Sequence, residues 1–355
     1  MKIIHVVYSM EMGGAESLVA QLCREQSSSG HDVLVLAYTN LGVLGERMRQ
    51  EGFRVDVLGR VSLSAAIRRC YQYFRKNRPD VVHCHNPAQA FIAYPGAWLA
   101  RVPTILCTRH SLVAPPYDFA QELKFSLTAR LGNRVVGICE STCTNLRHAP
   151  LAPRGQIVRV YNGAAALQPP AADERPLKAG PTIVFVGRLA PVKDLPTMLR
   201  AFAIARRSLP TLRLWIVGDG ALRTELEELA ATLNVTEAVT FWGERHDVAA
   251  FLATADLFSM SSVSEGLPMS LLQAMSLGLP AVVTDVGGMA EVVREAGCGL
   301  TAPPANPEAL AKAYVQALQD EGQNRAFASR ARAGFQSTFT LQQMAAAYDA
   351  LYQQR

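Results

Sequence analysis

The residues best placed for chemistry lie between Ser261 and Ala296. Glu265 and Pro268 belong to the run Glu-Gly-Leu-Pro, which is followed by apolar residues at helical spacing. A helix that begins on a glycine turn directs free N–H groups and the positive end of its dipole forward, where phosphate commonly binds. Because a carboxylate repels phosphate, Glu265 is expected to bind a neutral group such as a sugar hydroxyl. Gln273 follows about two turns later on the same helix.

A basic pair follows another predicted strand, Thr182–Val186. Gly187-Arg188 comes directly after it, and Lys193 lies a few residues further on. Two fixed cations can stabilise the negative charge that develops when a bond to a diphosphate breaks. The alternative is a solvated basic loop, but the position at the carboxyl end of a strand favours a ligand site.

Glycines mark two further turns. Gly13 and Gly14 lie between the first apolar run and a helical segment, either as an ordinary turn or as a loop that lets the backbone approach a diphosphate or an acceptor. Gly218 and Gly220 resemble the start of a dinucleotide fingerprint, but Arg223 occupies its third glycine position. A dehydrogenase is therefore a distant alternative.

Polar residues also follow two strands of the first half. His83 and His85 alternate on one strand, so their side chains share a face. Since no carboxylate follows closely, we predict no metal site there. His85 and Asn86 are expected to line an acceptor site, Arg109 either contacts acceptor or lies at the surface, and His110 is the stronger candidate for a functional residue.

Short β-rich runs alternate with helical segments along the chain, which predicts an α/β fold with doubly wound parallel sheets. The predicted strands are Lys2–Tyr8, Asp32–Ala37, Arg54–Leu58, Asp80–Cys84, Thr104–Cys107, Arg134–Ile138, Thr182–Val186, Leu212–Val217, Ala238–Phe241, Leu257–Met260 and Ala281–Thr284. Between residues 162 and 181 the composition changes to that of a linker, rich in Pro, Gly and Ala. We therefore predict one domain over 1–165 and a second over 166–339, with a last helix in 340–355.

The Glu-Gly-Leu-Pro run resembles the donor-binding signature of retaining glycosyltransferases of the GT-B fold, family 4. Glu265 matches the first glutamate of that signature, and Gln273 stands where a second is expected. In the family the second carboxylate holds the ribose hydroxyls of the nucleotide. Glutamine also accepts and donates hydrogen bonds, but without charge assistance.

The resemblance implies two Rossmann-like domains facing across a cleft, the first for acceptor and the second for donor, with the last helix packed on the first. It also implies that Arg188 and Lys193 hold the diphosphate and that His110 lies near the transferred sugar. With Glu265 these are the expected catalytic residues. The expected donor-binding residues are Gly13, Gly14, Arg188, Lys193, Gly218, Gly243, Arg245, Glu265, Gly266, Leu267, Pro268, Met269, Ser270 and Gln273. Arg245 either flanks the base or lies at the surface.

Composition sets limits on the function. The chain has 355 residues, enough for two cores, and its net charge of +5 is too small to indicate nucleic-acid binding. Its seven scattered cysteines indicate reduced core residues of a cytoplasmic protein. A basic helix, Ser64–Arg78, is either a solvated face or a site for an anionic inner-membrane surface.

The sequence thus predicts a metal-independent retaining glycosyltransferase. It would move a hexose-type sugar from a UDP- or GDP-linked donor, with no other cofactor, to a glycan or lipid-linked acceptor. Bacterial surface-polysaccharide or glycolipid assembly is expected by analogy only. A non-catalytic nucleotide-sugar-binding partner of an active transferase, and a nucleotide-sugar epimerase of the same fold, are the alternatives.

Overall fold

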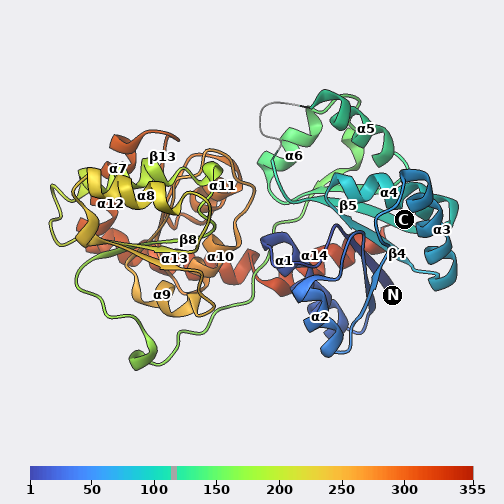
Figure 1. Cartoon of the computed structure of the whole chain (residues 1–355), viewed down its shortest axis with the longest axis horizontal. Helices are drawn as coiled ribbons and strands as arrows, with labels where there is room; N and C mark the ends of the chain where they lie inside the picture. The colour runs from blue at the N-terminus through green and yellow to red at the C-terminus, as the bar shows by residue number, and fades with distance from the viewer. Residues whose placement is uncertain (113–117, 355) are drawn as a thin grey trace. The chain divides into compact units, whose positions relative to one another are not determined.

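The structure, a computed structural model, describes residues 1–112 and 118–354. It divides into two compact units, which we call unit 1 (Met1–Gly163 with Leu341–Arg355) and unit 2 (Ala164–Thr340). The terminal helix expected in 340–355 belongs to unit 1, and Arg355 lies outside the described residues. Each unit has its own sheet between two layers of helices (Figure 1).

Unit 1 contains a seven-stranded sheet in the order β3-β2-β1-β4-β5-β6-β7. Its pairings are all parallel, and the strands are β1 (Lys2–Val7), β2 (Asp32–Ala37), β3 (Arg54–Val57), β4 (Val81–His85), β5 (Thr104–Arg109), β6 (Arg134–Gly137) and β7 (Ile157–Arg159). The central strands are apolar and buried because helices cover both faces. The register places His5 of β1 beside His83 of β4, and His85 beside Thr108 of β5.

The helices of unit 1 form two layers. They are α1 (Gly14–Ser28), α2 (Gly42–Gln50), α3 (Leu63–Asn77), α4 (Pro87–Leu99), α5 (Phe119–Ala129), α6 (Glu140–Arg147), the short η1 (Arg154–Gln156) and α14 (Leu341–Gln353). Figure 1 shows α14, in red, beside α1 on one side of the sheet, while α3, α4 and α5 lie on the other. Met344 and Tyr348 of α14 are buried against this unit, so the end of the chain completes its core.

Unit 2 contains a six-stranded parallel sheet in the order β10-β9-β8-β11-β12-β13. The strands are β8 (Thr182–Val186), β9 (Arg213–Val217), β10 (Val239–Gly243), β11 (Leu257–Met260), β12 (Ala281–Thr284) and β13 (Gly299–Ala302). The helices are η2 (Ala172–Glu174), η3 (Pro191–Lys193), α7 (Leu195–Ala205), α8 (Arg223–Thr232), η4 (Thr236–Ala238), α9 (Val248–Thr254), α10 (Met269–Ser276), α11 (Gly287–Ala296), α12 (Pro307–Gln319) and α13 (Glu321–Thr338).

In each sheet the next two strands of the chain are added on one side of the first strand, β1 or β8, and the later strands are added on its other side. This reversal of strand order is typical of doubly wound folds. The carboxyl ends of β8, β9, β10 and β11 therefore meet at one edge of unit 2. The predicted donor-binding residues of this unit lie at these ends, in the loops that follow them or in α10. Pro268 is the cap residue before α10, which begins at Met269, and has extended backbone angles.

Candidate functional site

An ion pair joins the two loops of unit 2 that were expected to hold a donor. Lys193 Nζ, at the end of η3, lies 2.5 Å from Glu265 Oε2, in the loop after β11. Both side chains are partly buried, with 16% and 19% of their surfaces exposed. The structure therefore brings these two predicted residues together, and each neutralises the charge of the other.

Hydrogen bonds to the backbone hold this pair in place. Ser261 Oγ donates to the carbonyls of Lys193 and Asp194, each at 2.9 Å. The amide of Val263 donates to the carbonyl of Val192 at 3.0 Å. The loop after β11 is thus fixed to the turn after β8, which sets the position of Lys193 against Glu265.

Three glycines meet at the ends of neighbouring strands. The Gly218 amide donates to the Gly243 carbonyl at 2.7 Å, and the Gly187 amide donates to the Val217 carbonyl at 3.0 Å. Gly218 has φ +131°, and a Cβ there would collide with the Gly187 carbonyl. Only glycine fits this crossing, which leaves backbone rather than side chains at the edge of the sheet.

The loop that carries Glu265 leads directly into α10. The Gly266 carbonyl accepts a hydrogen bond of 2.7 Å from the Gly288 amide at the start of α11. Gly266, Leu267 and Pro268 are buried, whereas Met269, Ser270 and Gln273 are partly exposed. Among the described residues the Gln273 side chain has no hydrogen-bond partner, so its amide is available to a ligand.

The two predicted arginines of unit 2 differ. Arg188 is exposed at the end of β8, and its side chain forms no ion pair with any described residue. Arg245 makes a bidentate pair with Asp247, at 2.8 and 2.7 Å, and lies over the ring of Phe251. The charge of Arg245 is therefore already matched, and its expected place beside a base stays a prediction.

In unit 1, Gly13 is the cap residue of α1 and has extended backbone angles. The Glu16 carboxylate folds back over it, so a Cβ at Gly13 would collide with Glu16 Oε2. Gly14, in contrast, is exposed and has open space around it. A narrow cavity of about 20 Å³ lies between Glu16 and the predicted acceptor residues His85 and Asn86.

Asn86 fixes the backbone of His110. Its Oδ1 accepts a 3.0 Å hydrogen bond from the His110 amide, and Asn86 itself has a positive φ of 75°. An unfavourable backbone conformation of this kind persists only where its surroundings enforce it. The His110 ring lies 3.0 Å from His85, between Nε2 and Nδ1. The structure therefore brings the predicted residues His85, Asn86 and His110 together.

Arg109 is buried rather than exposed. Its two terminal nitrogens each donate to Glu122 of α5 at 2.7 Å, and 7% of the arginine and 3% of the glutamate remain exposed. Breaking such a pair is costly, because it strands a charge in the interior. Arg109 therefore has a structural role, because its side chain joins β5 to α5. A contact between Arg109 and an acceptor stays a prediction.

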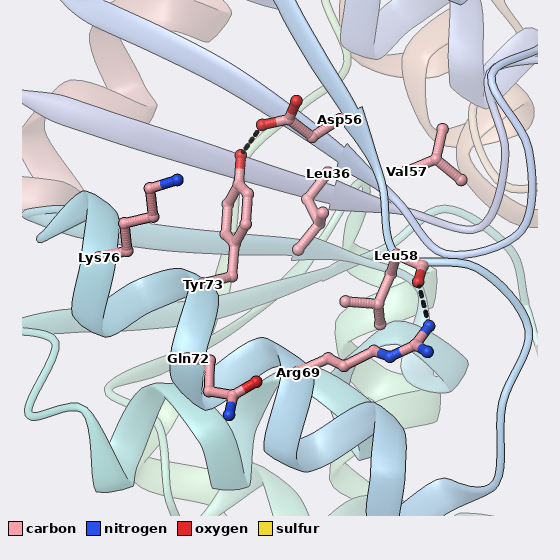
Figure 2. A pocket seen from close by; sticks show the side chains of 8 residues that line it. All are labelled: Leu36, Asp56, Val57, Leu58, Arg69, Gln72, Tyr73 and Lys76. Carbon is pink, nitrogen blue, oxygen red and sulfur yellow. Dashed lines mark hydrogen bonds between the residues drawn. The ribbon is translucent and has the colours of Figure 1, made fainter.

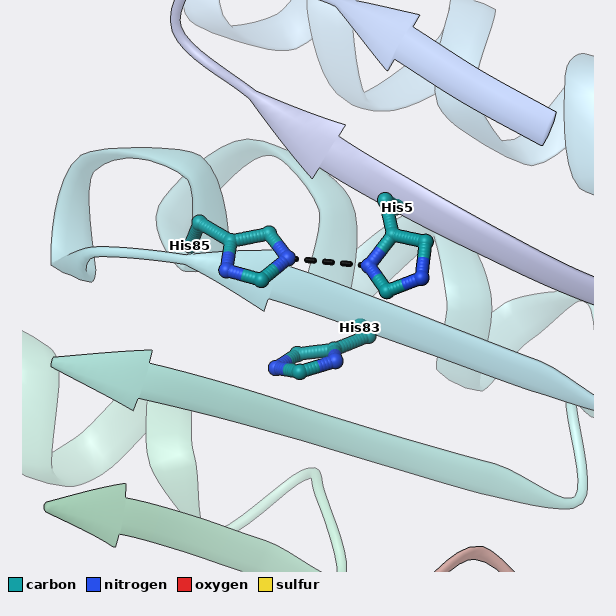
Figure 3. Close-up of side chains that lie close together, drawn as sticks. All are labelled: His5, His83 and His85. Atoms are coloured by element: carbon teal, nitrogen blue, oxygen red, sulfur yellow. Dashed lines mark hydrogen bonds between the residues drawn. The ribbon is translucent and has the colours of Figure 1, made fainter. Parts of the chain in front are cut away.

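The sequence reasoning missed His5. Its ring forms a cluster with His83 and His85, whose nearest ring nitrogens lie within 4.8 Å of one another (Figure 3). Its position on β1, one strand from two histidines with the same alternation, was the available signal. Burial lowers the pKa of His5 to about 4 and holds the pKa of His83 and His85 well below the usual value.

A cluster of three histidines can bind a metal ion, but here every ring nitrogen has another partner. His83 contacts Tyr352 and Thr108, each at 2.8 Å, and the remaining nitrogens of His5 and His85 are also hydrogen bonded. A bound cation would have to break these contacts. The geometry therefore favours a hydrogen-bonded network over a metal centre.

The predicted basic helix corresponds to α3. Its basic residues Arg68, Arg69, Arg75 and Lys76, and Arg78 after it, are all exposed. Figure 2 shows Arg69 and Lys76 on either side of Tyr73, whose hydroxyl donates to Asp56 at 2.6 Å. A pocket of about 430 Å³ nearby is lined by Arg75, Arg78 and Arg101 together with Asp80. This face of unit 1 is therefore strongly positive.

The described part of the chain contains no helix with the length and apolarity to span a bilayer.

Two family models match the chain in succession. Residues 12–165 match the model of glycosyltransferase family 4, and residues 171–334 match that of the glycosyl transferases group 1. Together they cover most of both units.

Individual relatives and structures agree with these models. The lipopolysaccharide core biosynthesis glycosyltransferase LpsE of Rhizobium meliloti is 25% identical, with 98% of each chain covered. A 2-deoxystreptamine glucosyltransferase of Streptomyces kanamyceticus is 28% identical over 74% of each chain. The crystal structure of Anabaena HepE in complex with UDP superposes with a TM-score of 0.88 at 19% identity, covering 99% of both chains, and shows the GT-B fold.

Proposed function

Because this chain belongs to the group 1 glycosyltransferases, we propose that unit 2 binds a nucleotide-diphosphate sugar and that the enzyme transfers its hexose with retention of configuration. The observation that carries the proposal is the Lys193–Glu265 pair in the loop that leads into α10. It combines a cation and helix amides for phosphate with a carboxylate for sugar hydroxyls.

In this proposal the cations act on the leaving group. Cleavage of the glycosidic bond leaves negative charge on the diphosphate, which Lys193 Nζ and the exposed Arg188 guanidinium would stabilise. These contacts strengthen as the charge develops, so they lower the barrier rather than merely tighten binding. Glu265 would exchange its bond to Lys193 for one to a sugar hydroxyl, which aligns the ring for an oxocarbenium-like transition state.

The same residues support a mechanism without a metal ion. Lys193 and Arg188 supply the positive charge that a divalent cation provides in other nucleotide-sugar enzymes. Retention would follow from attack on the same face, with the leaving phosphate accepting the proton of the acceptor hydroxyl. Full turnover in EDTA is the expected result, and activity that requires added Mg²⁺ or Mn²⁺ would reject this part of the proposal.

The acceptor is proposed to bind unit 1, where His110 contacts a substrate hydroxyl. Its chemical class, a glycan or lipid-linked sugar, is suggested by relatives such as LpsE, whose name refers to lipopolysaccharide core biosynthesis. The HepE structure contains UDP, which favours a UDP-linked donor. All seven cysteines are buried, and none of them forms a disulfide within the part of the chain that the structure describes, which agrees with a cytoplasmic enzyme.

We further propose that the positive face of α3 contacts an anionic inner-membrane surface. Trp98 and Leu99 of the neighbouring α4 are 57% and 53% exposed, so apolar and basic groups occur together there. Each basic residue near such a surface contributes about 1 kcal/mol. Co-sedimentation with anionic vesicles should fall when Arg75 and Arg78 are both changed to Glu. A change of the exposed Arg325 in unit 2 should have little effect, and equal binding to neutral vesicles would oppose the idea.

The donor is identified by thermal shift with UDP-, GDP- and ADP-sugars. A ligand at a hundred times its dissociation constant stabilises its binding unit by about 2.7 kcal/mol. The nucleotide sugar that raises the melting temperature is then incubated with the enzyme and candidate acceptors. The anomeric configuration of the product is determined by NMR. Binding without transfer would support a non-catalytic partner, an alternative suggested by Gln273. Conversion of the donor sugar without acceptor would support an epimerase.

A further inference from the structure

A line of hydrogen-bonded side chains crosses the interior of unit 1 and ends at His110. His110 Nε2 contacts His85 Nδ1 at 3.0 Å, His85 Nε2 contacts His5 Nδ1 at 2.9 Å, and His5 Nε2 contacts Gln26 Oε1 at 2.8 Å. Figure 3 shows the hydrogen bond between the ring nitrogens of His5 and His85 as a dashed line. We call Gln26, His5, His85 and His110 the histidine relay.

Gln26 gives the relay a direction. Its amide nitrogen donates to the Tyr352 hydroxyl at 3.2 Å, which turns its carbonyl oxygen toward His5. A carbonyl only accepts, so His5 Nε2 carries the proton. A neutral imidazole has one donor and one acceptor nitrogen, and His5 Nδ1 therefore accepts from His85 Nε2. By the same rule His85 Nδ1 accepts from His110 Nε2.

The rule applies because these rings are neutral. Burial lowers the pKa of His5 and of His110 to about 4. The pKa of His85 lies well below its usual value, first because of burial and then because of its histidine neighbours. At neutral pH each ring thus carries a single N–H proton.

The relay leaves one atom unused. His110 Nδ1 is buried and has no hydrogen-bond partner among the described residues. With the proton on Nε2, this nitrogen is an acceptor with a free lone pair. A buried polar atom without a partner costs about 1–3 kcal/mol, a cost that a ligand hydroxyl would relieve.

We propose that Gln26 and His5 are positioning residues, which act through His85 to keep the proton of His110 on Nε2 so that Nδ1 accepts a hydrogen bond from a substrate hydroxyl. The contact with substrate rests on the function proposed above, whereas the position of the proton does not. Neither Gln26 nor His5 touches the substrate in this account, and their effect passes through ring nitrogens alone.

The direct test is NMR of the ¹⁵N-histidine-labelled free protein at pH 7. Long-range proton–nitrogen correlations distinguish a protonated from an unprotonated ring nitrogen, and loss of one signal set in His110→Phe assigns the residue. The expected result is a protonated Nε2 and an unprotonated Nδ1 in His110. A protonated Nδ1 would overturn the proposal, even in a preparation that transfers no sugar.

Two variants then separate the relay from general packing. His5→Phe keeps a ring but removes the acceptor of His85. The His110 ring should then no longer be held in a single tautomer, and its NMR signals should show both. We expect kcat to fall about tenfold to a hundredfold, the range for loss of an orienting partner. KM for the donor should change little. His31→Phe is the matched control, because it makes the same change in unit 1 at a ring that contacts Asp349 and the amino group of Met1 rather than the relay. An unchanged His110 signature and kcat in His5→Phe would contradict the relay, as would equal losses in both variants. Should His5→Phe fail to fold, the wild-type spectrum alone decides.

Discussion

Lys193 allows the sharpest test at the scale of single residues. Lys193→Ala should lower kcat/KM for transfer by about 10²–10³, the usual cost of removing one group that stabilises developing charge. Its unfolding free energy should change little, because the pair with Glu265 is partly exposed. Lys178→Ala is the control, since Lys178 is paired with Asp256 at 2.8 Å in the same unit. Transfer near the wild-type rate in Lys193→Ala would remove the central assignment.

Gln273 provides a gain-of-function test. A carboxylate accepts hydrogen bonds from ribose hydroxyls more strongly than an amide, and the difference is about 1 kcal/mol. Gln273→Glu should therefore lower the dissociation constant of the nucleotide about fivefold, measured by calorimetry. Gln319→Glu, on the exposed face of α12, makes the same change of charge away from the site and should leave affinity unaltered. Weaker binding in Gln273→Glu would place this residue away from the ribose.

The residues that could be foreseen are those with a local signature. Glu265 and Lys193 each follow a strand within a recognisable turn, and parallel strands bring such turns to one edge of a sheet. His5 has no such signature, because it lies within an apolar strand and becomes notable only through the register of β1 with β4. The burial of Arg109 was equally hidden, since its partner Glu122 lies on a separate helix.

At the scale of elements, the Arg109–Glu122 pair joins β5, whose end leads to His110, to α5. Glu122→Gln leaves a buried guanidinium without its counter-charge, which should reduce the unfolding free energy of unit 1 by about 3–5 kcal/mol. The control is Glu51→Gln. Arg24 and Glu51 also form a bidentate pair, at 2.7 and 2.9 Å, but on the surface, where the expected cost is below about 1 kcal/mol. Urea unfolding of both variants measures the difference, and equal costs would contradict the structural part given to Arg109.

Elements were predictable where burial covers both faces of a strand. Asp32–Ala37, Thr182–Val186, Leu257–Met260 and Ala281–Thr284 have the predicted bounds because continuous β-branched and apolar runs are typical of the middle of a parallel sheet. The strands β7 and β13 were missed. Each lies at the edge of its sheet and is only partly buried, so its composition resembles that of a loop.

At the scale of the whole molecule, the buried neutral histidines are confined to unit 1, whereas His246, the only histidine of unit 2, is exposed. A histidine whose pKa is lowered on folding gains its proton first in the unfolded chain, below about pH 6.5. Its contribution to stability is therefore complete above that pH and is lost as the pH falls toward about 4 for His5 and His110. Each such group costs up to about 1.4 kcal/mol per pH unit in this range.

Acidification from pH 7 to pH 5 should consequently destabilise unit 1 more than unit 2. Hydrogen exchange followed by mass spectrometry, corrected for the intrinsic pH dependence of exchange, resolves the two through peptides from β1 and β4 and from β8 and β11. Loss of protection should appear first in the peptides from β1 and β4. In His5→Phe the stability of unit 1 should depend less steeply on pH, because one titrating group is gone. Equal loss in the strands of unit 2, which contain no histidine, would mean that the pH response has another origin. The groups whose protonation destabilises the protein at low pH would then lie outside the histidine relay.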